Sequence, residues 1–277
     1  MIEILKAVLF GIVEGITEWL PISSTGHMIL LNEFVSLDVS PEFWKMFLVV
    51  IQLGAIMAVV ILFWDKIFPF DLKKEPHIKK DIFTLWFKIL VACIPAAIVG
   101  VLFDDLFDEL FYNYTCVAIV LIVFGILFIV VENRNISKKA APRITDFSQI
   151  TYKVAAIIGI WQLIAAIFPG TSRSGATIIG ALLLGVSRTI AAEFTFFLSI
   201  PVMFGASLLK LVKYGLVYTT SEWTILAVGM IVAFVVSIIV IRFFMGYIRK
   251  HDFKIFGWYR IVLGILVLAY FMIFAGA

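Results

Sequence analysis

The chain has 277 residues, of which 63% are hydrophobic and only 15% are charged, and its mean hydropathy is +1.11. A soluble domain is about half apolar and about a quarter charged, so this composition excludes an ordinary soluble protein and indicates a polytopic membrane protein. The net charge of +3 comes from basic residues in short loops between apolar runs, so no nucleic-acid partner is expected.

The first two apolar segments are too short to cross a bilayer. Residues 4–20 end at Pro21, and residues 25–35 form a still shorter run. A spanning helix needs about 20 apolar residues, and shorter runs indicate broken or re-entrant segments. The same pattern returns in residues 154–168, which end at Pro169, and in residues 176–186. The sequence therefore predicts two re-entrant helix-loop-helix pairs.

Six other segments are long enough to span. The fold class expected from them is an all-α polytopic membrane protein with six transmembrane helices plus the two re-entrant pairs, in one integral membrane domain covering residues 1–277. The predicted spans are residues 43–64, 82–103, 115–131, 191–209, 225–241 and 255–274.

The loops between the spans predict an orientation. Loops rich in Lys and Arg lie on the cytoplasmic side of a membrane, which assigns the basic loops 65–81, 132–153 and 242–254 to the cytoplasm. The acidic loop 104–113 and the loop 210–223 then face outside. In this arrangement the first short pair enters the membrane from outside and the second enters from inside.

An internal repeat relates the two short pairs. Three matches share one offset of 148 positions: Gly11 with Gly159, Pro21 with Pro169, and Ser24 with Ser172. Each short pair is followed by an odd number of spans, so the two halves, roughly 1–140 and 149–277, are expected to be inverted-topology repeats. Interrupted segments at corresponding places of inverted halves indicate a binding site near the middle of the membrane.

The first interrupted segment carries acids, hydroxyls and a histidine. Glu14 and Glu18 are four residues apart, which places them on one helix face. Next to a bound phosphate, the two carboxylates can coexist if a divalent cation bridges them to the phosphate oxygens or if one is protonated. Ser24 and Thr25 begin the returning helix, and His27 lies one turn further on, where it is a candidate base for a Ser24 nucleophile.

The second interrupted segment supplies positive charge. Ser172, Arg173 and Ser174 lie where its returning helix begins. A helix N-terminus binds anions, and Arg is suited to bidentate contact with phosphate, so the expected ligand is a phosphate or a diphosphate. A purely structural salt bridge between Glu18 and Arg173 is the alternative interpretation.

Four other polar residues in or near apolar segments are interpreted as structural. Ser23 and Thr171 stand at helix starts, where Ser and Thr usually act as caps. Gln52 and Gln162 lie in apolar segments, where an amide usually forms a hydrogen bond between helices.

The two motifs resemble those of a known family. The chain carries Glu14-Gly-Ile-Thr-Glu18, Leu20-Pro-Ile-Ser-Ser-Thr-Gly-His27 and Pro169-Gly-Thr-Ser-Arg-Ser-Gly-Ala-Thr177. On these residues it resembles the undecaprenyl-diphosphate phosphatase family, the bacitracin-resistance type of integral membrane phosphatase. The likeness extends nearly from end to end of the chain.

The resemblance implies a function and a location. The implied reaction is hydrolysis of undecaprenyl diphosphate to undecaprenyl phosphate and inorganic phosphate, which recycles the lipid carrier for peptidoglycan and confers bacitracin resistance. The family requires a divalent cation, and Mg²⁺ or Ca²⁺ is expected here. The implied location is the bacterial inner (plasma) membrane, with the active site facing the periplasmic or outer side. The expected partners are a polyprenyl diphosphate lipid and the bilayer, and a homodimer is left open.

The site residues are assigned to three roles, combining the residues' own chemistry with the resemblance. The catalytic residues are Glu18, Ser24, His27 and Arg173; the phosphate-binding residues are Ser172, Arg173, Ser174, Thr177 and Thr25; and the metal-binding residues are Glu14 and Glu18.

Two questions stay open at this level. The attacking species is Ser24, His27 or a metal-bound water. A transporter or flippase of an anionic polyprenyl lipid is the alternative function, because inverted repeats with broken helices are also the architecture of secondary transporters.

Overall fold

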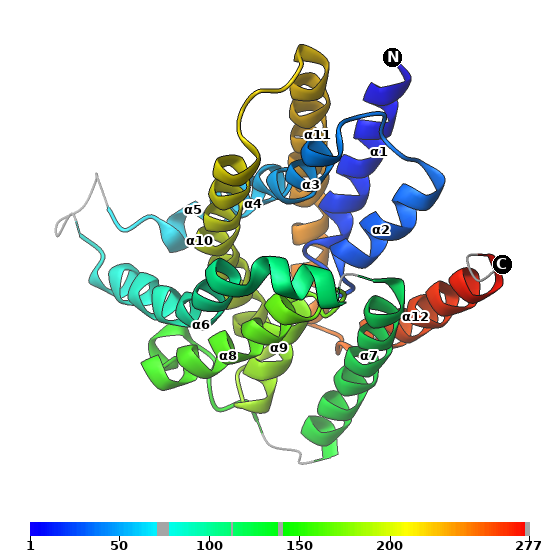
Figure 1. Cartoon of the computed structure of the whole chain (residues 1–277). Coiled ribbons are helices and arrows are strands. Elements are labelled where there is room, and N and C mark those ends of the chain that lie inside the picture. Colours follow the sequence, from blue (N-terminus) through cyan, green and yellow to red (C-terminus); the bar gives the residue numbers. More distant parts are fainter. Residues whose placement is uncertain (71–77, 112, 138–140, 275–277) are drawn as a thin grey trace.

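The computed structural model describes residues 1–70, 78–111, 113–137 and 141–274, and in this part of the chain every regular element is helical. Figure 1 shows the arrangement of these elements. They are α1 (Ile2–Thr17), α2 (Ser24–Phe34), α3 (Pro41–Val50), α4 (Gln52–Leu62), α5 (Trp64–Ile67), α6 (Lys80–Phe111), α7 (Tyr114–Ser137), the 3-10 helix η1 (Phe147–Gln149), α8 (Tyr152–Ile167), α9 (Arg173–Leu183), α10 (Arg188–Tyr214), α11 (Thr220–Ile248) and α12 (Lys254–Phe274).

Six segments of the described chain are long and apolar enough to cross a membrane, and they coincide with the six predicted spans. The first combines α3 and α4, and the others lie in α6, α7, α10, α11 and α12. Their bounds are Pro41–Leu62, Lys80–Phe103, Tyr114–Ser137, Arg188–Tyr214, Thr220–Ile248 and Lys254–Ile273. The prediction of a multi-pass, all-helical membrane protein is therefore confirmed.

The acidic segment after the second span is helical, so the loop predicted for residues 104–113 is wrong. Helix α6 continues to Phe111. The rings of Phe103 and Phe107 lie 6.0 Å apart, and those of Phe107 and Phe111 lie 6.1 Å apart. Aromatic contacts at this four-residue spacing favour a continued helix, whose acidic residues carry only a small propensity cost. The side chains of Asp104, Asp105 and Asp108 lie outside the described residues.

The basic loops are shorter than predicted, because the preceding helices continue beyond their apolar windows. Helix α7 ends at Ser137 and α11 at Ile248, so each helix takes in part of the basic segment that follows its span. Part of the predicted cytoplasmic loops lies outside the described residues, namely Lys73, Lys74, Lys138 and Lys139.

Three pairs of helices that are distant in sequence pack along each other. Helix α1 lies along α11, α8 lies along α6, and α7 lies along α12 (Figure 1). The first two pairs approach closely at a glycine. A Cβ atom added to Gly11 of α1 would lie 2.6 Å from the carbonyl oxygen of Gly229, and one added to Gly159 of α8 would lie 2.4 Å from that of Ala92.

The core surrounds the two interrupted segments, and the outer faces are apolar. Trp19 follows α1 and is fully buried, with its ring 5.1 Å from Phe196 in an edge-to-face contact. Large apolar side chains such as Leu208, Ile239 and Phe243 are exposed on α10 and α11. Exposed apolar surface of this kind is typical of helices that face lipid.

Candidate active site

The first interruption lies between α1 and α2. Pro21 follows the end of α1, and Ser23 has a φ of 75°, a left-handed conformation that side chains other than glycine rarely adopt. The Ser23 hydroxyl accepts a hydrogen bond from the Gly26 amide at 3.2 Å, so Ser23 caps α2, as predicted. Ser24 is therefore the first residue of α2.

The second interruption repeats this geometry. Gly170 and Ser172 have φ values of 91° and 67°, and the Ser172 hydroxyl accepts from the Gly175 amide at 3.2 Å. Ser172 therefore caps α9, and Arg173 is its first residue.

The matching caps correct one part of the predicted repeat. The sequence alignment paired Ser24 with Ser172, whereas the structure pairs Ser23 with Ser172 as caps, 149 positions apart. Ser23 and Ser172 are the only residues other than glycine with positive φ in the described chain. Ser24 consequently corresponds to Arg173, and each residue opens its helix.

These two opening residues meet on one carboxylate. The Ser24 hydroxyl donates to Oε2 of Glu18 at 2.7 Å, and Nη2 of Arg173 donates to Oε1 of Glu18 at 2.7 Å. The Glu18 side chain is buried, at 6% exposure. A charge-assisted hydrogen bond of this length is strong. The starts of α2 and α9 therefore converge on Glu18, although Arg173 is 155 positions away in sequence.

Glu14 lies one turn before Glu18. The Glu18 amide donates to the Glu14 carbonyl at 3.0 Å and the backbone of Glu18 is still helical, so both carboxylates lie on the same side of α1, as predicted. Glu14 is 1% exposed, and its Oε1 atom has no hydrogen-bond partner in the described structure. Nη1 of Arg173 is likewise buried without a partner. Buried polar atoms normally have a partner, so a ligand that offers a positive charge to Glu14 and an anionic oxygen to Arg173 would satisfy both groups.

A cavity of about 430 Å³ opens next to these groups. Glu14, Ser24 and Thr25 line it from the first interrupted segment. Lys45 and Gln52 line it from α3 and α4, so the cavity takes in residues that the sequence did not assign to the site. The Gln52 amide donates to the Leu48 carbonyl at 3.2 Å, four residues back in the same span, so this contact is not the hydrogen bond between helices that was predicted.

His27 has different partners from those expected. Its Nδ1 lies 2.7 Å from the Ser23 carbonyl oxygen, and its Nε2 lies 2.6 Å from the Tyr259 hydroxyl. A carbonyl can only accept, so in a neutral ring Nδ1 carries the proton and Nε2 accepts from Tyr259. Both ring nitrogens are occupied, and Ser24 is bonded to Glu18 instead. The expected Ser24–His27 pair is not formed in this structure.

The remaining hydroxyls of the second segment are inside the protein. The Ser174 hydroxyl lies 3.0 Å from that of Ser172 and donates to the Glu18 carbonyl at 3.4 Å. The Thr177 hydroxyl donates to the Arg173 carbonyl at 2.9 Å and lies 2.8 Å from the Thr195 hydroxyl. These contacts fix the first turn of α9 and hold the Arg173 backbone in place.

Arg260 is a residue of the site that the sequence interpretation missed. It lies on α12 and is fully buried. Its Nη1 donates to the Pro21 carbonyl at 3.2 Å, and its Nη2 donates to the carbonyls of Gly170 and Thr171 at 2.9 and 2.8 Å. One guanidinium therefore ties the two interrupted segments together. A lone arginine within an apolar span was a signal for this role, because such residues are costly and usually functional.

The chain is similar to known proteins over nearly its whole length. The family model described as bacitracin resistance protein BacA matches residues 7–266. A Desulfitobacterium hafniense protein named undecaprenyl-diphosphatase is 65% identical over 271 residues, covering 98% of this chain and 97% of that protein. Undecaprenyl-diphosphatase 1 of Clostridium acetobutylicum is 65% identical over 272 residues, covering 98% of both chains. Undecaprenyl-diphosphatase of Enterococcus faecalis is 61% identical over 269 residues, covering 96% of both. With these matches, the chain belongs to the bacitracin resistance protein BacA family.

Proposed function

We propose that this protein hydrolyses undecaprenyl diphosphate to undecaprenyl phosphate and inorganic phosphate. The reaction recycles the lipid carrier for peptidoglycan and other cell-wall polymers, supports cell shape and confers bacitracin resistance. Relatives that match nearly the whole chain bear the name undecaprenyl-diphosphatase. The observation that carries the proposal is the Glu18 carboxylate held between the Ser24 hydroxyl and the Arg173 guanidinium.

Ser24 is the nucleophile that this geometry favours. Its hydroxyl already donates to Glu18, which therefore accepts the proton as Ser24 Oγ bonds to the terminal phosphorus of the substrate. The bond from that phosphorus to the oxygen of undecaprenyl phosphate breaks, and the phosphoryl group stays on Ser24. A water molecule then attacks the phosphoserine, the bond between phosphorus and Ser24 Oγ breaks, the proton on Glu18 returns to Oγ, and inorganic phosphate leaves with the protons of the water.

Positive charge for the phosphoryl oxygens comes from Arg173 and from two helix starts. Nη1 of Arg173 has no protein partner, so it is available to a phosphoryl oxygen while Nη2 stays on Glu18. The N-termini of α2 and α9 each add roughly half a positive charge. Thr25 lines the cavity, and Ser172, Ser174 and Thr177 support the backbone around Arg173.

His27 is still predicted to be needed for catalysis, but its proposed role is to orient α2 and not to act as the base for Ser24. Its ring holds the Ser23 carbonyl at 2.7 Å, and Ser23 directly precedes Ser24. In this arrangement His27 orients the first turn of α2 rather than taking the Ser24 proton directly.

The divalent cation, Mg²⁺ or Ca²⁺, is assigned to Glu14 and Glu18. These hard cations bind oxygen ligands, and Mg²⁺ is commonly held by one or two carboxylates plus substrate phosphates. The unpartnered Oε1 of Glu14 supports this fit. Glu14 and Glu18 would supply the carboxylate oxygens of the protein, and phosphate oxygens of the substrate would supply further ligands. When bound, the cation neutralises charge on the phosphate oxygens.

The two interrupted pairs are proposed to be re-entrant and to belong to inverted repeats. The packing supports this, because α1 pairs with α11 of the second half while α8 pairs with α6 of the first. The corresponding last spans of the halves, α7 and α12, pack on each other. The left-handed caps at Ser23 and Ser172 stand at matching places.

The proposed location is the bacterial inner (plasma) membrane, with the active site facing the periplasmic or outer side. Its support is the distribution of Lys and Arg among the loops. The oligomeric state was left open, and the molar mass of the detergent-solubilised protein would distinguish a monomer from a homodimer.

The experiment is a phosphate-release assay with purified protein, undecaprenyl diphosphate and Mg²⁺, with and without chelator. Release is expected only with the cation, and Arg173→Ala, Glu18→Gln and His27→Ala should each lower it strongly. Substrate labelled in the terminal phosphate should transiently label the wild-type protein but not Ser24→Ala. Near-normal release by all three variants would refute the site. Movement of the lipid across liposomes without phosphate release would instead favour a transporter.

A further inference from the structure

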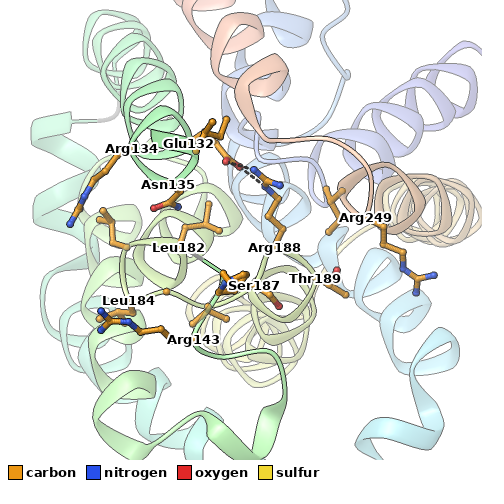
Figure 2. Close-up of a pocket in the computed structure, with 17 residues that line it drawn as sticks. Glu132, Arg134, Asn135, Arg143, Leu182, Leu184, Ser187, Arg188, Thr189 and Arg249 are labelled. Carbon is orange, nitrogen blue, oxygen red and sulfur yellow. Dashed lines mark hydrogen bonds and ion pairs between the residues drawn. The ribbon is translucent and has the colours of Figure 1, made fainter. Parts of the chain in front are cut away.

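A second, larger cavity lies at the far end of α9 from Arg173. Its volume is about 600 Å³. Since α9 has 11 residues, the cavity lies about 15 Å along the helix from its first residue. The cavity is lined by the last turns of α7, α9 and α11 and by the first turn of α10 (Figure 2). The proposed hydrolysis does not use it.

The lining is strongly cationic. Among the described lining residues, the arginines Arg134, Arg143, Arg188 and Arg249 accompany one carboxylate, that of Glu132. Arg188 forms a two-pronged pair with Glu132, at 2.8 and 2.6 Å, and the Phe253 amide also donates to Glu132 at 3.1 Å. Glu132 is therefore fully engaged, and the other three guanidinium groups have no carboxylate of the described lining to neutralise them. Figure 2 shows them spread around the Glu132–Arg188 pair.

Tertiary contacts hold the cationic groups around the cavity. The backbone amides of Arg143 and Ile144 donate to the Gly185 carbonyl at 2.9 and 3.1 Å, and the Ser187 amide donates to the Ile144 carbonyl at 2.8 Å. Gly185 has a φ of 83°, and the Arg143 side chain packs against its Cα face. These contacts place Arg143 directly beside the N-terminus of α10, which begins at Arg188 and adds positive potential.

The cavity also has apolar walls and lies at the level of a membrane surface. Leu182, Leu184 and Ile136 line it next to the arginines. The span in α7 ends at Ser137, and the span in α10 begins at Arg188. Apolar walls next to arginines at the end of the spans suit a phosphate headgroup attached to acyl chains.

We propose that this cavity binds a phosphate-bearing anion. Its position at the end of the spans favours the headgroup of an anionic phospholipid as the source over free phosphate. Arg134 and Arg143 are the residues expected to contact the phosphate, while Arg188 holds Glu132 and the frame of the cavity.

The test uses the full-length protein in neutral detergent, titrated with phosphatidylglycerol or with phosphatidylcholine and observed by native mass spectrometry. The cavity variant is Arg134→Gln with Arg143→Gln. The control is Arg242→Gln with Lys250→Gln, which removes the same charge from exposed residues of the same end of the molecule that do not line the cavity. Size-exclusion profile and thermal midpoint establish that both variants are folded.

The expected result is preferential binding of phosphatidylglycerol, weakened about tenfold or more in the cavity variant and unchanged in the control, because charge-assisted hydrogen bonds to the phosphate are lost. A parallel titration with inorganic phosphate separates the sources. If only inorganic phosphate loses a binding site in the cavity variant, the ligand is a soluble phosphate anion. Equal binding of both ligands by the wild-type protein and the cavity variant, or an equal loss in the control, would overturn the proposal.

Discussion

At the scale of single residues, the site depends on Glu18. The structural alternative for Glu18 and Arg173 was a salt bridge without further function, and the salt bridge is present at 2.7 Å. The same carboxylate also accepts from the Ser24 hydroxyl. In the proposed function this pair has a role beyond structural support, because Glu18 would hold the proposed nucleophile Ser24 beside a guanidinium whose second nitrogen has no partner in the described structure.

The first prediction concerns Glu18→Gln. The amide keeps the size of the side chain but cannot accept the Ser24 proton, and it loses the charge that holds Arg173. Phosphate release should fall by about hundredfold or more. Glu33→Gln is the matched control, because Glu33 is exposed on α2, and it should leave the rate unchanged. Equal rates for the two variants would contradict the role of Glu18.

The second prediction concerns Glu14→Gln and the cation. Because the unpartnered Oε1 of Glu14 is the assigned ligand, the Mg²⁺ concentration for half-maximal phosphate release should rise by about tenfold or more. At saturating Mg²⁺ much of the rate should return. The measurement is a Mg²⁺ titration after chelation, beside the wild-type protein and Glu33→Gln. An unchanged Mg²⁺ dependence would remove Glu14 from the metal site.

At the scale of elements, the site is made by two helices that begin in the same unusual way. Ser23 and Ser172 both cap a helix while their backbones are left-handed, with φ values of 75° and 67°. Left-handed backbone costs an L-residue roughly 1–2 kcal/mol. The cap hydrogen bond partly offsets this cost. The turn sets the direction in which Ser24 and Arg173 leave the loop.

The third prediction compares Ser172→Gly with Ser172→Ala. Both changes remove the cap, but only glycine also relieves the left-handed backbone, so the glycine variant should be more stable by about 1–2 kcal/mol. The midpoint of thermal unfolding in detergent measures the difference. At Thr151, which caps α8 with a φ of −83°, the corresponding gap between the glycine and alanine variants should be smaller. If Ser172→Ala were as stable as Ser172→Gly, the positive φ at position 172 would not strain the backbone.

At the scale of the whole molecule, α12 connects the two interrupted segments. Arg260 binds carbonyls from both interrupted segments, and the neighbouring Tyr259 bonds to His27. The last helix therefore sets the distance between the start of α2 and the start of α9.

The fourth prediction concerns Arg260→Met. Removing the guanidinium leaves buried carbonyls of both segments without a donor, which should lower the free energy of unfolding by about 3 kcal/mol or more. Phosphate release should fall with it, because Ser24 and Arg173 lose their common frame. Arg260→Lys keeps a positive charge and hydrogen-bond donors on a single nitrogen. Its stability and its rate of phosphate release should lie between those of the wild-type protein and those of Arg260→Met. Arg242→Met, at an exposed position of α11, is the control. An unchanged thermal midpoint for Arg260→Met would contradict the proposal that Arg260 stabilises the two interrupted segments.

The sequence by itself determined the six spans, the two short pairs and the residues of both motifs. Span length and a proline break are local properties, so they can be read from apolar runs and from Pro21 and Pro169. The end of α6 could not be predicted this way, because contacts among Phe103, Phe107 and Phe111 outweigh the acidic residues between them.

Only the tertiary structure decided which of these groups meet. Glu14 and Glu18 share a helix face by spacing alone, but the contact of Glu18 with Arg173 spans 155 positions, and those of Arg260 span 239 and 90. The partner of Ser24 depends on the left-handed turn at Ser23, which directs Ser24 toward Glu18 while His27 reaches Tyr259. Such pairings are set by how helices pack across the membrane, and that packing depends on contacts far apart in the chain.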